Sequence, residues 1–199
     1  MNKRETDSAI NLLFIKYVLG PCSLLCLAAF ALGYWYPQAV FIAQNIAQTI
    51  GLNNLVANRL GDSKFSSAAY LYWLTFWITL PFDLLWLHYT AINQKFLTAI
   101  RFIINLSLAT GHWDLKKYGL YTGAMRFLLY FLLFFGITTL HLISAIEPSN
   151  CKGCETSSAI GFIVINWLMT HISILLCYWS ASYLVVWKSI RSTFGRVLD

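Results

Sequence analysis

Long apolar stretches alternate with short polar ones along this chain. Four of the apolar stretches contain at most one charged residue each, namely 17–36, 69–90, 124–146 and 159–187. An α-helix rises about 1.5 Å per residue, so roughly 20 apolar residues are enough to cross the hydrocarbon core of a bilayer. The pattern therefore predicts four transmembrane helices.

Two other stretches mix apolar and polar residues at helical spacing. In 39–58, apolar residues such as Phe41 and Ile46 alternate with amides such as Gln44 and Gln48. In 92–109 the apolar positions are interleaved with basic residues. A modestly apolar amphipathic helix is typical of the membrane surface, so we expect an outer interfacial helix at 39–58 and an inner one at 92–109. The predicted fold is all-α: one polytopic domain over 1–199, a four-helix transmembrane bundle with two interfacial helices.

Composition agrees with this assignment. The chain is 58% hydrophobic and only 11% charged, whereas soluble domains are about a quarter charged. Of its 14 Lys and Arg, 11 lie in 1–16, 91–126 and 188–199. This is the positive-inside bias, and it predicts a multi-pass inner-membrane protein with both termini cytoplasmic. The formal charge of +6 is thereby explained without a nucleic-acid partner.

Asp83 is the one acid inside a predicted span, and it follows Pro81 closely. Proline cannot donate the helical hydrogen bond, so we expect a bend there. A carboxylate inside a membrane is costly unless it is paired. We predict an intramembrane ion pair between Asp83 and Arg126, just inside the cytoplasmic end of the third span. Lys16 is an alternative partner, and a proton or substrate relay is an alternative role.

Small and polar residues form stripes on two predicted spans. In the first span Cys22, Cys26, Ala29 and Gly33 recur at helical spacing, which favours the close approach of another helix. In the fourth span the helix-packing seam consists of Asn166, Thr170, Ser173, Cys177 and Ser180. A hydrated pathway is the rival interpretation of this seam, but it would need charged residues along the stripe, and the stripe has none.

Histidines and cysteines provide no cofactor site. His88, His141 and His171 are expected at different depths, so no two of them match as axial ligands of a haem. A zinc site at Cys151 and Cys154 would need two further ligands nearby, and the sequence offers none there. We therefore predict no cofactor and no metal.

Cys151 and Cys154 form a CxxC motif in a predicted outer loop. This spacing allows either a structural disulfide or a redox-active pair, and the intervening Lys152 would favour the thiolate. In span count and in this motif the chain resembles the disulfide-bond-forming membrane oxidases, which implies thiol oxidation. Those proteins carry a second reactive Cys pair in the other outer loop, whereas 38–67 contains no Cys here.

Function is expected to lie in contacts with other membrane proteins. We predict a non-enzymatic accessory or assembly subunit of a bacterial envelope complex, of the secretion or conjugation type, whose partners are the lipid bilayer and other membrane proteins. An immunity protein against a pore-forming bacteriocin is an alternative, because that group is similar in size and four-span topology. A thiol-disulfide oxidoreductase using Cys151 and Cys154, and a small channel or transporter subunit, are further alternatives.

Overall fold

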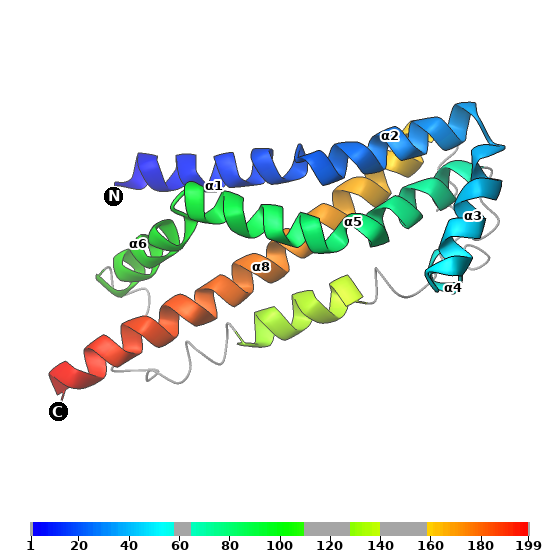
Figure 1. Ribbon diagram of the computed structural model, residues 1–199. Helices are drawn as coiled ribbons and strands as arrows, with labels where there is room; N and C mark the ends of the chain where they lie inside the picture. Colours follow the sequence, from blue (N-terminus) through cyan, green and yellow to red (C-terminus); the bar gives the residue numbers. More distant parts are fainter. Residues whose placement is uncertain (1, 58–64, 110–127, 140–158, 199) are drawn as a thin grey trace. The chain divides into compact units, whose positions relative to one another are not determined.

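The computed structural model describes residues 2–57, 65–109, 128–139 and 159–198 of the chain, without the side chains of 107–109, 159–165 and 189–198. All regular structure in these ranges is helical, and none of it is strand (Figure 1). The helices are α1 (Lys3–Val18), α2 (Pro21–Trp35), α3 (Ala39–Thr49), α4 (Asn53–Ala57), α5 (Ser66–Asn93), α6 (Phe96–Ala109) and α8 (Ala159–Leu198). A further apolar helix, Leu128–Thr139, lies between α6 and α8 in the sequence.

Three helical stretches are long and apolar enough to cross a membrane: Lys3–Trp35, Ser66–Asn93 and Asn166–Lys188. They confirm that the described part of the chain is all-helical and contains membrane-length helices. The predicted third span, 124–146, is described only over Leu128–Thr139. The rest of it lies outside the described residues, so the four-span arrangement stays a prediction.

The first membrane-length stretch begins earlier than expected and is interrupted. Helix already starts at Lys3, because Asn2 caps α1: its side-chain oxygen accepts from the Glu5 amide at 2.9 Å. Gly20 and Pro21 separate α1 from α2. Pro21 has no amide hydrogen, and the Tyr17 carbonyl instead accepts from the Gly20 amide at 2.9 Å. The break between α1 and α2 therefore leaves the Tyr17 carbonyl paired.

The stretch predicted as one helix at 39–58 is two helices, α3 and α4. Gly51 adopts a left-handed backbone (φ 74°) between them, which ends α3. In α3 the two small residues Ala43 and Ala47 are buried, whereas three bulky apolar residues are exposed: Phe41, Ile42 and Ile46. The hydrophobic face of α3 thus points away from the protein.

Helix α6 begins after a tight junction with α5, slightly later than the predicted start of 92–109. Lys95 has a left-handed backbone (φ 54°) at this junction, and its carbonyl accepts from the Ala99 amide at 3.0 Å. The face of α6 that carries Phe96, Ile100 and Ile104 is fully buried. Burial of this apolar stripe stabilises the packing of α6 on the rest of the compact unit to which it belongs.

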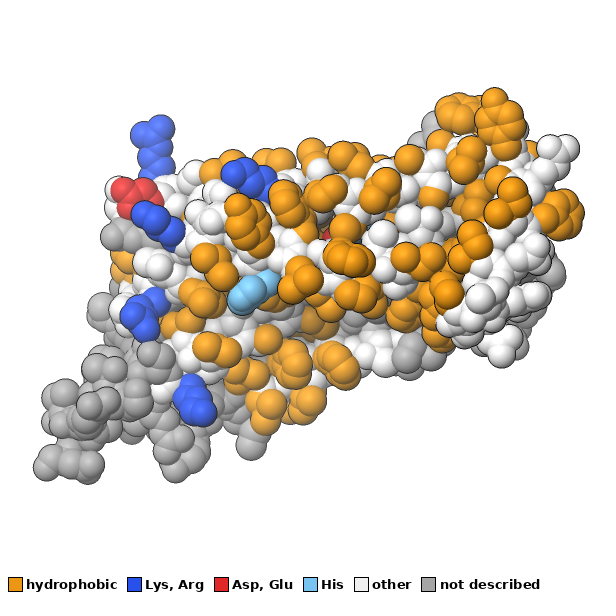
Figure 2. All heavy atoms as spheres, in the orientation of Figure 1, with side chains coloured by type: hydrophobic (Ala, Val, Ile, Leu, Met, Phe, Trp, Pro, Cys, Tyr) orange, Lys and Arg blue, Asp and Glu red, His pale blue; other side chains and the backbone are white. Residues whose placement is uncertain are grey.

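The chain forms two compact units. Unit 1 comprises Met1–Lys16, Leu87–Thr138 and Ser173–Asp199, and unit 2 comprises Tyr17–Trp86 and Thr139–Ile172. Apart from Asp83, every charged residue that the structure describes belongs to unit 1. On the face drawn in Figure 2, Lys and Arg side chains gather over unit 1, and hydrophobic side chains cover α2.

Within unit 2, α2 and α5 approach each other closely. A Cβ atom on Gly33 would lie 2.7 Å from the Ala68 Cα and 2.8 Å from the Ser67 carbonyl oxygen. Cys22, Cys26 and Gly33 of the first predicted stripe are buried, and Ala29 is half-buried. The prediction that this stripe admits another helix is confirmed, and the helix is α5.

Candidate functional site

The site is built around Asp83, which α5 carries into the interior of unit 2. Helix α5 continues through Pro81, two residues earlier. The Tyr17 hydroxyl donates to Asp83 Oδ2 at 2.8 Å. Tyr17 is 0% and Asp83 2% exposed, so this hydrogen bond is closed to the surroundings. Tyr17 therefore supplies the donor that a buried carboxyl requires.

His171 of α8 lies against Tyr17, and it is also buried. The two ring centroids are 5.7 Å apart. His171 Nδ1 lies 2.8 Å from the Trp167 carbonyl oxygen. A carbonyl can only accept, so Nδ1 is the protonated nitrogen, and in the neutral ring Nε2 remains as an acceptor. Asp83 and His171 are close enough to interact electrostatically.

The break between α1 and α2 positions the next member of the cluster. Ser23 lies in the first turn of α2, and its hydroxyl donates to the Val18 carbonyl at 2.6 Å. The same hydroxyl accepts from the indole nitrogen of Trp167 in α8. Gly20 leaves room for Trp86 of α5, whose indole nitrogen would lie 2.7 Å from a Cβ added there. Unit 2 residues of α1, α2, α5 and α8 thus meet next to the Gly20–Pro21 break.

Thr79 continues the cluster by one helical turn along α5. Its hydroxyl donates to the Thr75 carbonyl at 2.8 Å and lies 4.0 Å from the Cys26 sulfur. Asp83 Oδ1, by contrast, has no hydrogen-bond partner among the described residues. Asp83 is also the only charged residue that the structure describes in unit 2.

The chemistry of this arrangement is limited by its closure. Tyr17 and Asp83 share a hydrogen bond along which a proton could move, whereas the hydrogen bond of His171 goes to the Trp167 carbonyl. A reaction on a substrate needs an accessible reacting group, and Tyr17, Asp83 and His171 are all at most 2% exposed. In the described ranges, no group of three or more His, Cys, Asp or Glu side chains could hold a metal ion.

Three residues of the predicted sites lie outside the described residues: Arg126, Cys151 and Cys154. The Asp83–Arg126 ion pair and the disulfide or redox role of the CxxC motif therefore stay predictions. In its described surroundings, Asp83 is paired with a tyrosine hydroxyl and not with a cation.

The predicted seam on α8 lies toward the interior of the protein. Thr170 and Ser180 are buried, and Asn166, Ser173 and Cys177 are half-buried. The hydroxyls of Thr170 and Ser180 donate to carbonyls of their own helix, at Asn166 and Leu176. Cys177 makes a contact with another helix, since its sulfur lies 3.1 Å from the Thr138 hydroxyl oxygen.

Sequence reasoning found Asp83 but missed Tyr17 as its partner. Tyr17 stands at the start of an apolar stretch, where tyrosine is usual at the membrane interface. The usable signal was the early helix start: with helix from Lys3, Tyr17 falls well inside the membrane-length stretch. His171 was considered only as a haem ligand, and only the tertiary structure brings it to Tyr17.

The fold and this site define an all-helical protein of membrane-length helices with a closed polar cluster between them. Comparison with known proteins finds no matching family model, no similar curated protein and no similar solved structure.

Proposed function

We propose that the protein is a non-enzymatic integral membrane protein that acts by binding other membrane proteins, as an accessory or assembly subunit of a bacterial envelope complex. The observation that carries this proposal is a stripe of bulky apolar side chains on the outer face of α5. Its members are all exposed and recur at intervals of four and three residues: Ile78, Phe82, Leu85, Tyr89 and Ile92.

This spacing, four then three residues, is the spacing at which one helix packs along another. The stripe is 43% to 65% exposed, whereas Asp83 and Leu87 on the other face of α5 are buried. Bulky residues in such a register can interlock with the side chains of a partner helix, which gives specificity beyond general lipid contact. The proposed occupant of the α5 stripe is a transmembrane helix of another protein.

The closed cluster supports the same proposal. Since Tyr17, Asp83 and His171 are sealed from the surface, their proposed role is to hold α5 against the parts of α1 and α8 that belong to unit 2. Buried polar groups that are matched to one another can select one packing over its alternatives. Such a protein would act through the exposed faces of its helices and not through a reaction in its interior.

Purification from the native host in a gentle detergent tests this function. We expect a second integral membrane protein to co-purify at a fixed ratio, because a helix packed on the α5 stripe buries bulky apolar side chains such as Phe82 and Leu85. Recovery of this protein as a lone monomer would contradict the proposal.

The membrane arrangement that goes with this function has four spans, with both termini cytoplasmic in the inner membrane. It also places α3 at the outer surface and α6 at the inner one as interfacial helices. For α3 the support is its inverted packing: it buries Ala43 and Ala47 and exposes Phe41 and Ile42. Those exposed side chains can enter the boundary between headgroups and acyl chains.

Spin labels on α3 test this placement. A nitroxide at Ile42 should be reached by dissolved oxygen, which concentrates in lipid, because this side chain faces away from the protein. A nitroxide at the exposed Gln48 should be reached mainly by a water-soluble nickel complex. Equal accessibility of the two labels to the nickel complex would place α3 in water instead.

A transporter subunit is a second candidate, favoured by one observation. Asp83 Oδ1 has no hydrogen-bond partner among the described residues, so it could receive a proton. If this were its work, proteoliposomes should show a proton flux that Asp83→Asn abolishes. Under the leading proposal they show no flux.

A thiol oxidoreductase reaction would depend on Cys151 and Cys154, and trapping of mixed disulfides with a Cys154→Ala variant tests it.

A further inference from the structure

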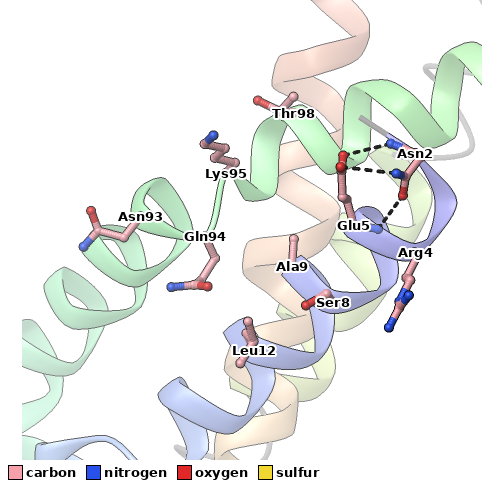
Figure 3. Close-up of a pocket in the computed structure, with 10 residues that line it drawn as sticks. All are labelled: Asn2, Arg4, Glu5, Ser8, Ala9, Leu12, Asn93, Gln94, Lys95 and Thr98. Carbon is pink, nitrogen blue, oxygen red and sulfur yellow. Dashed lines mark hydrogen bonds between the residues drawn. The ribbon is translucent and has the colours of Figure 1, made fainter.

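Unit 1 contains an open pocket of about 720 Å³ that is separate from the Asp83 cluster (Figure 3). One wall comes from the start of α1, with Asn2, Arg4, Glu5, Ser8, Ala9 and Leu12. The other comes from the α5–α6 junction, with Asn93, Gln94, Lys95 and Thr98. Most of these side chains are polar, which is unusual for a pocket in so apolar a chain.

Two cations line the pocket, Arg4 from α1 and Lys95 from the junction. Neither makes an ion pair with another described residue. The one carboxylate in the lining, Glu5, is already engaged: its two oxygens accept from the backbone and side-chain nitrogens of Asn2 at 3.0 and 3.2 Å. The lining thus carries two cations and one carboxylate, a net positive charge, and in Figure 3 the charged ends of Arg4 and Lys95 point away from each other.

Neutral donors accompany these charges. Ser8 and Thr98 contribute hydroxyl groups, and Asn93 and Gln94 contribute amides. The Lys95 carbonyl accepts the first helical hydrogen bond of α6, so the amides of the first turn have no acceptor within the helix. Positive side chains, hydroxyls and a helix start together form the donor set that recognises a phosphate group.

The pocket is also amphiphilic, and this identifies the kind of phosphate. Leu12, which is 39% exposed, lines the end of the pocket further along α1. Ile92 is exposed at the end of α5, directly before the pocket residue Asn93. A free phosphate ion gains no stabilisation from apolar side chains, whereas a lipid carries its glycerol and acyl chains next to the phosphate.

We propose that this pocket binds the phosphate of an anionic phospholipid headgroup, with Arg4 and Lys95 as the charged contacts and Leu12 beside the glycerol. It lies where two membrane-length stretches, Lys3–Trp35 and Ser66–Asn93, have their polar ends. Anionic lipid in the facing leaflet would then fix the junction of α5 and α6 to the start of α1.

The test is lipid binding by the full-length protein in a mild non-ionic detergent. The probe is phosphatidylglycerol with a fluorescent acyl chain and an unmodified headgroup. We expect the double variant Arg4→Gln, Lys95→Gln to bind it at least about tenfold more weakly, because two charge-assisted hydrogen bonds are lost. The control double variant, Lys3→Gln with Lys188→Gln, removes two exposed charges of unit 1 that do not line the pocket, and it should bind within about twofold of the unmodified protein.

Competition distinguishes the sources of phosphate. Unlabelled phosphatidylglycerol should displace the probe, whereas phosphatidylcholine and glycerol phosphate at the same concentration should not. Equal loss of binding in the pocket and control variants would overturn the proposal, since the net charge of the protein, and not the pocket, would then explain the binding. Displacement by glycerol phosphate as effective as that by the lipid would overturn it as well, because the apolar part would then contribute nothing. Thermal unfolding of both variants in the same detergent shows whether each is folded, and Lys95→Arg should retain binding if the charge is what matters.

Discussion

Replacement of Tyr17 by Phe is expected to lower the free energy of unfolding by about 1–3 kcal/mol, because it leaves a buried carboxyl without its donor. The Tyr17 hydroxyl is bonded to Asp83 Oδ2 at 2.8 Å, and Asp83 Oδ1 has no described partner that could compensate. The change is measured by denaturation of the detergent-solubilised protein. The control is Tyr130→Phe, which removes the hydroxyl of a half-exposed tyrosine and should change stability by less than about 0.5 kcal/mol.

Asp83→Asn completes this experiment. Its side-chain oxygen can still accept from the Tyr17 hydroxyl, so we expect a loss smaller than that of Tyr17→Phe. The opposite order would contradict the Tyr17 pairing as the main support of the carboxyl. A tolerated Tyr17→Phe together with a severely destabilised Asp83→Asn would instead favour the predicted ion pair with Arg126, since only the charge would then matter.

Gly33→Ala is expected to destabilise the packing of α2 on α5 by about 1–3 kcal/mol. The added methyl group would meet backbone atoms of Ala68 and Ser67 at 2.7 and 2.8 Å, and backbone cannot move aside as a flexible side chain can. Helix propensity alone would predict the opposite sign, since Ala is a better helix former than Gly by about 1 kcal/mol.

Gly136→Ala is the matched control for this substitution. Gly136 lies in the helix Leu128–Thr139, and a Cβ there would meet nothing within 4 Å. Only the propensity term applies, so this variant should be unchanged or more stable by up to about 1 kcal/mol. If Gly33→Ala and Gly136→Ala shifted the unfolding temperature equally, the close approach of α2 and α5 would not explain the effect of the substitution at Gly33.

Much of the fold could be predicted because the bilayer constrains sequence more strongly than water does. An uncharged stretch of membrane length must be helical, since no other single segment satisfies its own backbone groups in lipid. A close helix contact at Cys22, Cys26 and Gly33 could also be predicted, because small residues at helical spacing permit one. That α5 is the partner helix could not be predicted, since such a stripe does not specify which helix packs against it.

The boundaries were harder to predict, for local reasons. The residues before Tyr17 are polar enough to look like a surface segment, yet the Asn2 cap starts a helix at Lys3. The helix from Lys3 to Lys16 adds about four turns before Tyr17, so Tyr17 lies inside the membrane-length stretch and not at its start. In 39–58 the positive φ of Gly51 splits what periodicity alone presents as one helix.

The candidate site required tertiary information. Asp83 stood out in the sequence because an acid in a membrane-length stretch needs a partner. Sequence alone favours opposite charge as that partner, and so it directed attention to Arg126. The structure shows that a phenol can meet the same need, because the Tyr17 hydroxyl donates to Asp83.

The central claim is that this protein works through the outer face of α5 and not through a reaction at Asp83. Its most direct test is site-specific photo-crosslinking in native membranes, with a photoreactive residue replacing Leu85 on the α5 stripe or Leu87 on the buried face. We predict one discrete adduct with a second membrane protein at Leu85 and none at Leu87. A smear of lipid adducts alone at Leu85, with no protein adduct there or at Phe82, would contradict the claim.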